Sequence, residues 1–420
     1  MRVNEPDLSS VRSRFPGLSR SLDGRPCVFA DAPGGSQVPE SVIEAMAGYL
    51  RRSNSNTHGA FATSRETDEV IAGARIAGAA FTGADPDEIV FGPNATTLLF
   101  AVSRSVARTL GPGDEVVVTL LDHDANITPW VMAAEDAGAT VRRVDIHDED
   151  VTLDLESFDA ALGERTKVAA FTLASNAAGT VTPAADLVRR VRERSPDAIV
   201  CVDAVHLAQH RPLDLHGLGA DVLACSPYKF FGPHLGILAA DRELLARLRP
   251  YKVRPAEDTA PDRWETGTKN HEGLAGLSAA VDYLADIGSG PGGQAGRPDL
   301  RGRIVAGMEA IRAYERTLSL RFLEGVGGVH GVRTYGIADP GRVDERTPTF
   351  AVRVGDRHPL DTAKALAERG VYVWDGHYYA LALMERLGLQ ETGGAVRIGF
   401  CHYNTPDEVD RVIEEIASLG

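Results

Sequence analysis

The sequence predicts an α/β fold: a large domain with a mostly parallel sheet covered by helices on both faces, and a smaller α/β C-terminal domain. Short apolar runs alternate with segments of helical periodicity, and the runs are continuous rather than alternating, which is typical of parallel strands buried on both faces. The length of 420 residues exceeds one typical domain. We expect an N-terminal arm at 1–30 that packs with the small domain, a large domain at 31–287, and a small domain at 288–420.

The elements of the large domain follow from these patterns. Ser41 and Glu44 form a capping-box pattern that predicts the start of a helix. Further helices are predicted at 65–81, 96–108, 127–137 and 184–194. Strands are predicted at 27–30, 88–92, 115–121, 141–146, 167–173, 199–203, 221–225 and 237–240.

The small domain is expected after a segment rich in glycine and proline at 288–298, which predicts a loop near the boundary between lobes. A long helix is predicted from about 300 to 320. The remaining predicted elements are strands at 349–354, 371–374 and 395–399, a helix that ends near 369, and a final helix at 406–419.

Composition excludes several classes of function. The net charge of -15, without any polybasic run, argues against nucleic acid or an anionic membrane surface as a partner. The N-terminus has no apolar signal region and no run could span a bilayer, so we expect a cytoplasmic protein without a membrane partner. The four cysteines show no CxxC spacing, which indicates neither a metal site nor a disulfide framework.

Lys229 is the lysine best placed for chemistry. The chain has five lysines, and only Lys229, among aromatics, prolines and glycines at 226–236, has apolar neighbours that could desolvate its amine. Desolvation lowers the pKa of a lysine and makes it nucleophilic. The alternative interpretation is a structural lysine in a loop between strands.

Asp203 ends an apolar strand about twenty-five residues before Lys229. A carboxylate at the carboxyl end of a parallel strand points into the crevice where open α/β sheets bind ligands. An aspartate and a Schiff-base lysine are the pair that pyridoxal phosphate needs, one to keep the pyridine nitrogen protonated and one to hold the aldehyde. A helix cap or turn residue is the alternative role for Asp203.

In these residues the chain resembles the class V aminotransferase-type, fold-type I pyridoxal-phosphate enzymes, nearest to the cysteine desulfurase and selenocysteine lyase branch. The resemblance runs from about Phe29 to the C-terminal helix. It implies a pyridoxal 5'-phosphate cofactor held by Lys229 and Asp203. The further cofactor residues that it implies are Ala95 and Thr96 at a helix start and Ser226 for the phosphate, His123 over the ring, and Asn176 and His206 at the phenolic oxygen.

The resemblance also implies residues for the substrate and for a second subunit. Arg397 matches the arginine that grips the substrate α-carboxylate, a job suited to a bidentate fork. Thr268, in Glu265-Thr266-Gly267-Thr268-Lys269-Asn270, matches a threonine that reaches the neighbouring subunit's cofactor, so a homodimer with shared sites is expected. His58, in the polar loop at 54–59, is a further candidate substrate-binding residue.

One departure from the family pattern decides the expected reaction. Tyr379 stands where cysteine desulfurases carry a nucleophilic cysteine, and Trp374 replaces a second substrate arginine. Cys401 is near in sequence but does not align with that loop. We therefore expect a β-elimination with C–S cleavage on a small α-amino acid, with Lys229 as base and His123 assisting proton transfer. Transamination and desulfuration through another thiol remain alternatives, and Tyr379 is either an orienting or proton-donating residue or a packing residue.

Overall fold

The computed structural model describes residues 11–289 and 299–420. Its larger sheet has seven strands in the order β4-β10-β9-β8-β7-β5-β6. All neighbouring pairs are parallel except those of β10, which runs antiparallel to β4 and β9. The strands are β4 (Ile89–Gly92), β5 (Glu115–Thr119), β6 (Thr140–Val144), β7 (Thr166–Thr172), β8 (Ile199–Asp203), β9 (Val222–Cys225) and β10 (Gly236–Ala240).

Both faces of this sheet are buried, as the continuous apolar runs predict. In β8, Ile199 and Cys201 belong to one apolar cluster, whereas Val200 and Val202 belong to another. The first cluster includes side chains of α4 (Ala95–Ala107) and α5 (Thr128–Ala137). The second includes side chains of α3 (Ala62–Thr82), α6 (Leu155–Ala161), α7 (Ala184–Arg194) and α10 (His271–Ser289). The sheet is therefore the middle layer of three, and helices lie on either side.

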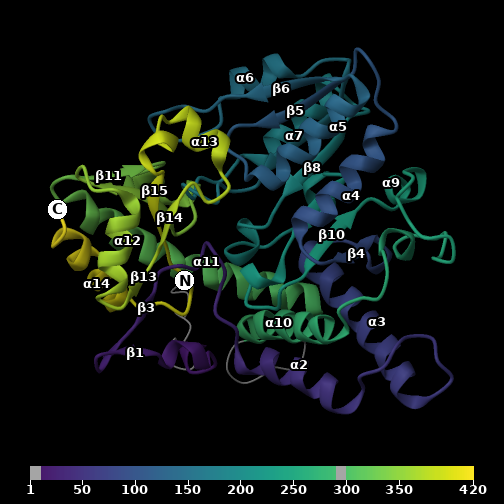
Figure 1. Cartoon of the computed structure of the whole chain (residues 1–420), viewed down its shortest axis with the longest axis horizontal. Coiled ribbons are helices and arrows are strands. Elements are labelled where there is room, and N and C mark those ends of the chain that lie inside the picture. The colour runs from purple at the N-terminus through teal and green to yellow at the C-terminus, as the bar shows by residue number, and fades with distance from the viewer. Residues whose placement is uncertain (1–10, 290–298) are drawn as a thin grey trace.

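The second sheet has four antiparallel strands in the order β11-β12-β15-β14. Figure 1 shows these strands with α12 and α14 on the left, and the large sheet on the right. The elements of this part are α11 (Leu300–Gly327), β11 (Val332–Tyr335), β12 (Thr349–Val354), α12 (Pro359–Ala367), β13 (Val371–Tyr372), β14 (Trp374–Gly376), α13 (Leu381–Arg386), β15 (Ala395–Gly399) and α14 (Pro406–Ala417).

The described part of the N-terminal segment contacts this second sheet region. Strand β3 (Val28–Phe29) pairs in parallel with β13, and the short strands β1 (Ser21–Leu22) and β2 (Arg25–Pro26) pair with each other. Arg12 donates hydrogen bonds to the Tyr403 carbonyl and to the Glu408 carboxylate.

The predicted capping box at Ser41 is wrong. Helix α2 spans Glu40–Arg52, so Ser41 lies inside it, and its N-cap residue Pro39 makes no side-chain capping bond. The backbone N–H of Glu40 instead donates to the Arg14 carbonyl at 2.8 Å, so a partner distant in sequence satisfies the helix start. A capping box is present at α14, where Thr405 and Glu408 bond reciprocally.

Other differences concern elements that the apolar pattern did not reveal. Helices α6, α8 (Leu215–Leu218), α9 (Arg242–Arg247), α10 and α13 and strand β11 were not predicted. Gly288 and Ser289 belong to α10 rather than to a loop, and the rest of the predicted boundary loop, 290–298, lies outside the described residues.

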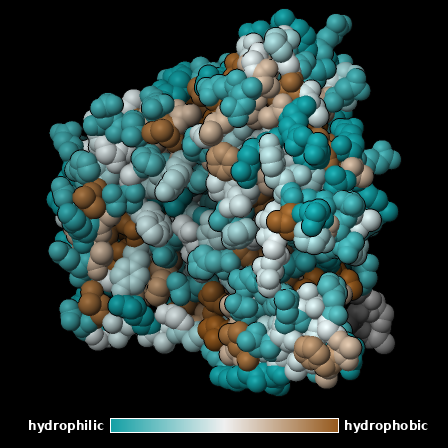
Figure 2. Space-filling model, turned by 45° about the vertical axis from the view of Figure 1, so that its right-hand side comes forward, coloured by the Kyte–Doolittle hydropathy of each residue, from teal (hydrophilic) through white to brown (hydrophobic). Residues whose placement is uncertain are grey.

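The surface agrees with the acidic, polar composition. The face in Figure 2 is mostly hydrophilic, with hydrophobic residues in small scattered groups. Within residues 11–289 and 299–420, no helix is both long and apolar enough to cross a membrane.

Candidate active site

Seven of the predicted cofactor residues, together with Lys229, line one cavity of about 60 Å³, which we call the inner cavity. It lies where β7, β8 and β9 end and where α4 begins. The carboxyl ends of parallel strands share one sheet edge, so side chains that follow different strands converge there. The predicted residues that line the inner cavity are Ala95, Thr96, His123, Asn176, Asp203, His206, Ser226 and Lys229.

Lys229 is buried, with 7% of its surface exposed. Its ammonium donates to the Pro33 carbonyl and lies 5.2 Å from the Tyr228 ring centroid. Burial, and to a smaller extent the charge of Arg397, lower the pKa of Lys229 from 10.5 to about 7, whereas Asp203 opposes the shift. A substantial fraction of this amine is therefore neutral, and nucleophilic, near neutral pH.

Asp203 is buried at the end of β8, and its Oδ1 accepts the Val205 N–H at 2.8 Å. Burial raises the pKa of Asp203 to about 6, while that hydrogen bond and Lys229 lower it. A cationic pyridine nitrogen beside this carboxylate would replace the solvation that burial removes. Asp122, which the sequence analysis did not single out, is also buried, and its pKa is raised to about 8 by burial and by the charge of Asp203.

His123 is held neutral and in one tautomer. Burial, then Lys229 and Arg397, lower the pKa of His123 to about 4. Its Nδ1 accepts the Ala125 N–H at 3.0 Å, so the ring proton lies on Nε2. The imidazole can therefore both stack on an aromatic ring and donate a hydrogen bond.

The start of α4 forms a cradle for an anion. The Asn94 side chain caps the helix by accepting the Thr97 N–H at 2.8 Å, and the Ala95 N–H donates to Ser226 Oγ at 3.2 Å. Free N–H groups at a helix start bind phosphate well. Gly236 permits this packing, because a Cβ there would lie 2.4 Å from the Asn94 carbonyl carbon.

Arg397 and Asn176 connect the two sheets. Arg397, buried in β15, donates to the Asn176 carbonyl at 2.9 Å, and Asn176 Nδ2 donates to the Tyr378 carbonyl at 2.9 Å. Within the described residues, Asn176 Oδ1, His206 Nδ1 and Arg397 Nε are buried and have no hydrogen-bond partner. Such atoms are costly unless a ligand satisfies them.

A second cavity of about 1050 Å³, which we call the outer cavity, shares His123, Asn176 and Lys229 with the inner cavity. Tyr379 and Arg397 line it, as does Trp374. The Tyr379 ring stacks on His123 at 5.5 Å between centroids and 14° between planes. Tyr378 and Tyr379 both have left-handed backbone conformations, with φ of 54° and 58°, so this turn is held in place by its surroundings.

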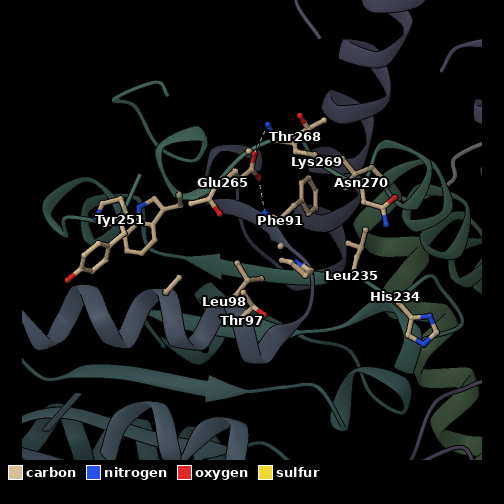
Figure 3. A pocket seen from close by; sticks show the side chains of 18 of the residues that line it. Phe91, Thr97, Leu98, His234, Leu235, Tyr251, Glu265, Thr268, Lys269 and Asn270 are labelled. Carbon is tan, nitrogen blue, oxygen red and sulfur yellow. Dashed lines mark hydrogen bonds and ion pairs between the residues drawn. The ribbon is translucent and has the colours of Figure 1, made fainter. Parts of the chain in front are cut away.

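Two predicted residues lie away from these cavities. Thr268 lines a separate cavity of about 550 Å³, where Glu265 accepts the Phe91 N–H and pairs with Lys269 (Figure 3). The His58 side chain is 88% exposed and lies 3.4 Å from the Asp68 carboxylate. The structure therefore does not bring Thr268 or His58 to the site of the same chain.

All four cysteines, Cys27, Cys201, Cys225 and Cys401, are buried and free. None of them lines the inner or the outer cavity. Burial raises the pKa of the Cys401 thiol well above its usual value, which opposes thiolate formation.

The sequence patterns gave no role to several residues of the site. Gly34 and Phe100 line the outer cavity, and the Pro33 carbonyl accepts a hydrogen bond from Lys229. The pair Gly34-Gly35 was the available signal, because adjacent glycines often mark close backbone approach.

Comparisons with known proteins identify the relatives of this chain. A model of the Aminotransferase class-V family matches residues 28–291 and 304–412. A probable cysteine desulfurase 2 of Mycobacterium leprae is 36% identical, with 97% of this chain and 95% of that protein covered. A cysteine desulfurase of Cronobacter sakazakii is 32% identical, with 97% and 96% covered.

Two solved structures show the same fold. The apo structure of a cysteine desulfurase from Thermococcus onnurineus superposes with a TM-score of 0.86 at 27% identity, and covers 100% of this chain and 98% of that one. A cysteine desulfurase from Escherichia coli gives a TM-score of 0.82 at 25% identity, with 98% of each chain covered.

Members of this family use pyridoxal phosphate, and the residues present fit that group. A buried lysine and a buried carboxylate share the inner cavity, a helix start offers N–H groups, and buried polar atoms of Asn176 and His206 lack partners within the described residues. The chain therefore belongs to the class-V aminotransferase family of fold-type I pyridoxal-phosphate enzymes, in its cysteine desulfurase-like branch.

Proposed function

We propose that this enzyme cleaves the C–S bond of a cysteine-type amino acid by β-elimination, without forming a protein persulfide. The observation that carries the proposal is the lack of a thiol at the site: segment 374–380 contains no cysteine, and the four cysteines are buried outside both cavities. A desulfurase transfers sulfur to a thiolate, and a phenol such as that of Tyr379 cannot accept it. The sulfur therefore leaves as a free thiol or sulfide.

Each residue of the inner cavity has a proposed role toward the cofactor. Lys229 would hold it covalently, and Asp203 would keep the pyridine nitrogen protonated, so that the bound ring stabilises a carbanion at the substrate Cα. The start of α4, with Ala95 and Thr96, would bind the phosphate together with Ser226. His123 would stack on the ring, and Asn176 and His206 would bond to the phenolic oxygen.

Arg397 and three residues that act on protons, Lys229, His123 and Tyr379, complete the proposal. Arg397 would bind the substrate carboxylate. Burial removes water from the guanidinium and lowers the pKa of Arg397 to about 10, and the carboxylate would supply a charged partner in place of that water. Lys229 would also act as the base that takes the proton from the substrate Cα. The hydroxyl of Tyr379 would then donate a proton to the departing sulfur, and the Nε2–H of His123 would assist by donating a hydrogen bond to that sulfur.

We also propose a homodimer in which Thr268 and His58 serve the site of the partner subunit. Their positions away from the inner cavity of their own chain support this assignment. The proposed division into an arm (1–30), a large domain (31–287) and a small domain (288–420) is supported by the pairing of β3 with β13.

The test is a product survey with the purified enzyme and L-cysteine in the absence of other thiols. Elimination yields pyruvate, ammonia and sulfide in equal amounts. Accumulation of the amino form of the cofactor, with a requirement for an added 2-oxo acid, would establish the aminotransferase alternative. Peptide mass mapping covers the second alternative: a persulfide on Cys401, with activity lost in Cys401→Ser, would establish desulfuration through another thiol.

A further inference from the structure

The outer cavity is much larger than the side chain of cysteine requires. Its volume of about 1050 Å³ reaches the upper end of the range for drug-sized ligands, roughly 300–1,000 Å³. The cofactor would take part of this volume, because the outer cavity shares His123, Asn176 and Lys229 with the inner cavity. Lys229 and Arg397, which would face the amino and carboxyl groups of a substrate, line the cavity together with the loop at 374–379. A substrate bound between these two residues would therefore leave space beyond its sulfur atom.

The wall of that space is aromatic. The lining includes Phe100, Tyr378, Tyr379 and Trp374. Tyr379 is 68% exposed and Trp374 is 48% exposed. Large aromatic faces open to solvent at a cavity wall are typical of sites that hold an apolar ligand group.

The two exposed rings are held in fixed positions. Trp374 Nε1 donates to the Asp31 carbonyl at 3.1 Å, and a Cβ on Gly34 would lie 2.1 Å from that nitrogen. The Tyr379 carbonyl accepts the Asp124 N–H at 2.7 Å, and its ring stacks on His123. Pre-organised side chains lose little entropy when a ligand binds.

The charges of the cavity disfavour an anionic substituent. Among the described residues that line it, Lys229 and Arg397 are the only lysine and arginine, and both are assigned to the amino-acid head group. Asp124 and Asp375 also line the cavity, as do His234 and His377. A negative group beyond the sulfur would therefore meet two carboxylates without a lysine or arginine to pair with it.

We propose that the substrate is an S-substituted cysteine whose substituent is uncharged and apolar, an aryl or alkyl group held by Trp374 and Tyr379. This inference rests on the proposed elimination and names its substrate class. Lys229 removes the Cα proton, the Cβ–S bond breaks, and its electron pair leaves with the sulfur, which takes a proton to give the free thiol. The remaining 2-aminoacrylate reacts with water to give pyruvate and ammonia, so the sum is R–S–CH2–CH(NH3+)–COO− + H2O giving RSH, pyruvate and NH4+.

The first experiment compares three substrates on the holoenzyme: L-cysteine, S-benzyl-L-cysteine and S-carboxymethyl-L-cysteine. We expect kcat/KM for the benzyl compound to exceed that for cysteine at least tenfold, and that for the carboxymethyl compound to be the lowest. In Trp374→Ala the benzyl value falls at least tenfold more than the cysteine value, and Trp374→Phe keeps most of the benzyl activity. Cysteine is the internal control, because a general defect of the variant would lower both values.

A binding experiment gives a readout that does not depend on turnover. Trp130 and Trp264 are buried, so Trp374 is the tryptophan exposed to ligands. We expect 3-(benzylthio)propionate, which lacks the reacting amine, to quench tryptophan fluorescence with a Kd at least tenfold below that of 3-mercaptopropionate, and Trp374→Phe to abolish the quenching. A wild-type preference for cysteine, or equal loss of both activities in Trp374→Ala, would overturn the substrate class and leave the elimination standing. Absence of pyruvate from all three compounds would overturn the elimination itself.

Discussion

The lowered pKa of Lys229 has a consequence for stability that can be measured without any substrate. Its pKa is about 7 in the folded protein and about 10.5 in an unfolded chain. Between these values the unfolded state binds the additional proton, so protonation favours unfolding and stability rises with pH. This difference in proton binding lowers the free energy of unfolding by about 4 kcal/mol at pH 7 and by about 2 kcal/mol at pH 9. The slope is about 1.36 kcal/mol per pH unit where the amine is protonated in the unfolded state and neutral in the folded state.

Lys229→Met removes this loss of stability while keeping a side chain of similar length. The variant leaves the Pro33 carbonyl without its donor, which costs about 1 kcal/mol at any pH. We therefore expect the cofactor-free variant to be more stable than the wild type by about 3 kcal/mol at pH 7 and by about 1 kcal/mol at pH 9. Asp122, with its pKa raised to about 8, titrates in both proteins, so its effect cancels in the difference.

The assay is equilibrium urea unfolding of both cofactor-free proteins between pH 7 and 9, at constant ionic strength and protein concentration. Lys364→Met is the matched control, because Lys364 is exposed on α12 and its removal leaves the difference unchanged with pH. A stability difference for Lys229→Met that is the same at pH 7 and pH 9 would refute the argument that burial depresses this pKa.

Three further predictions concern the site and the fold. Asp203→Asn should bind the cofactor but lose activity by about 10²-fold or more, because the charged partner of the pyridine nitrogen is lost; cofactor absorbance and kcat are the measurements, and near wild-type turnover would exclude the role. Thr268→Ala and Lys229→Ala should each be inactive, yet activity should return on mixing the unfolded chains and refolding them, since one site of the heterodimer is intact; no recovery, with dimers present, would contradict the shared site. Arg346→Met should lower the free energy of unfolding by about 3 kcal/mol, because the buried guanidinium donates to four backbone carbonyls; a change under about 1 kcal/mol in urea unfolding would count against it.

The sequence alone determined the layered α/β fold and much of the inner cavity. Continuous apolar runs specify strands buried on both faces, and the carboxyl ends of parallel strands meet at one edge whatever their separation along the chain. Asp203 and the residues before Lys229 each follow such a run, so their convergence could be predicted from the order of elements. The resemblance to a known family then supplied the residues that pattern cannot reveal, such as Asn176 and Arg397.

Only the tertiary structure decided what surrounds these residues. The start of α2 depends on the Arg14 carbonyl, and the charge of Lys229 depends on its burial beside Pro33. The Tyr379 ring stacks on His123 because of the way the loop at 374–379 meets the large sheet. Each of these contacts joins segments that are far apart in the sequence. Periodicity reports which face of an element is buried, whereas a pKa, a helix start or a cavity wall depends on which distant groups fill the space beside it.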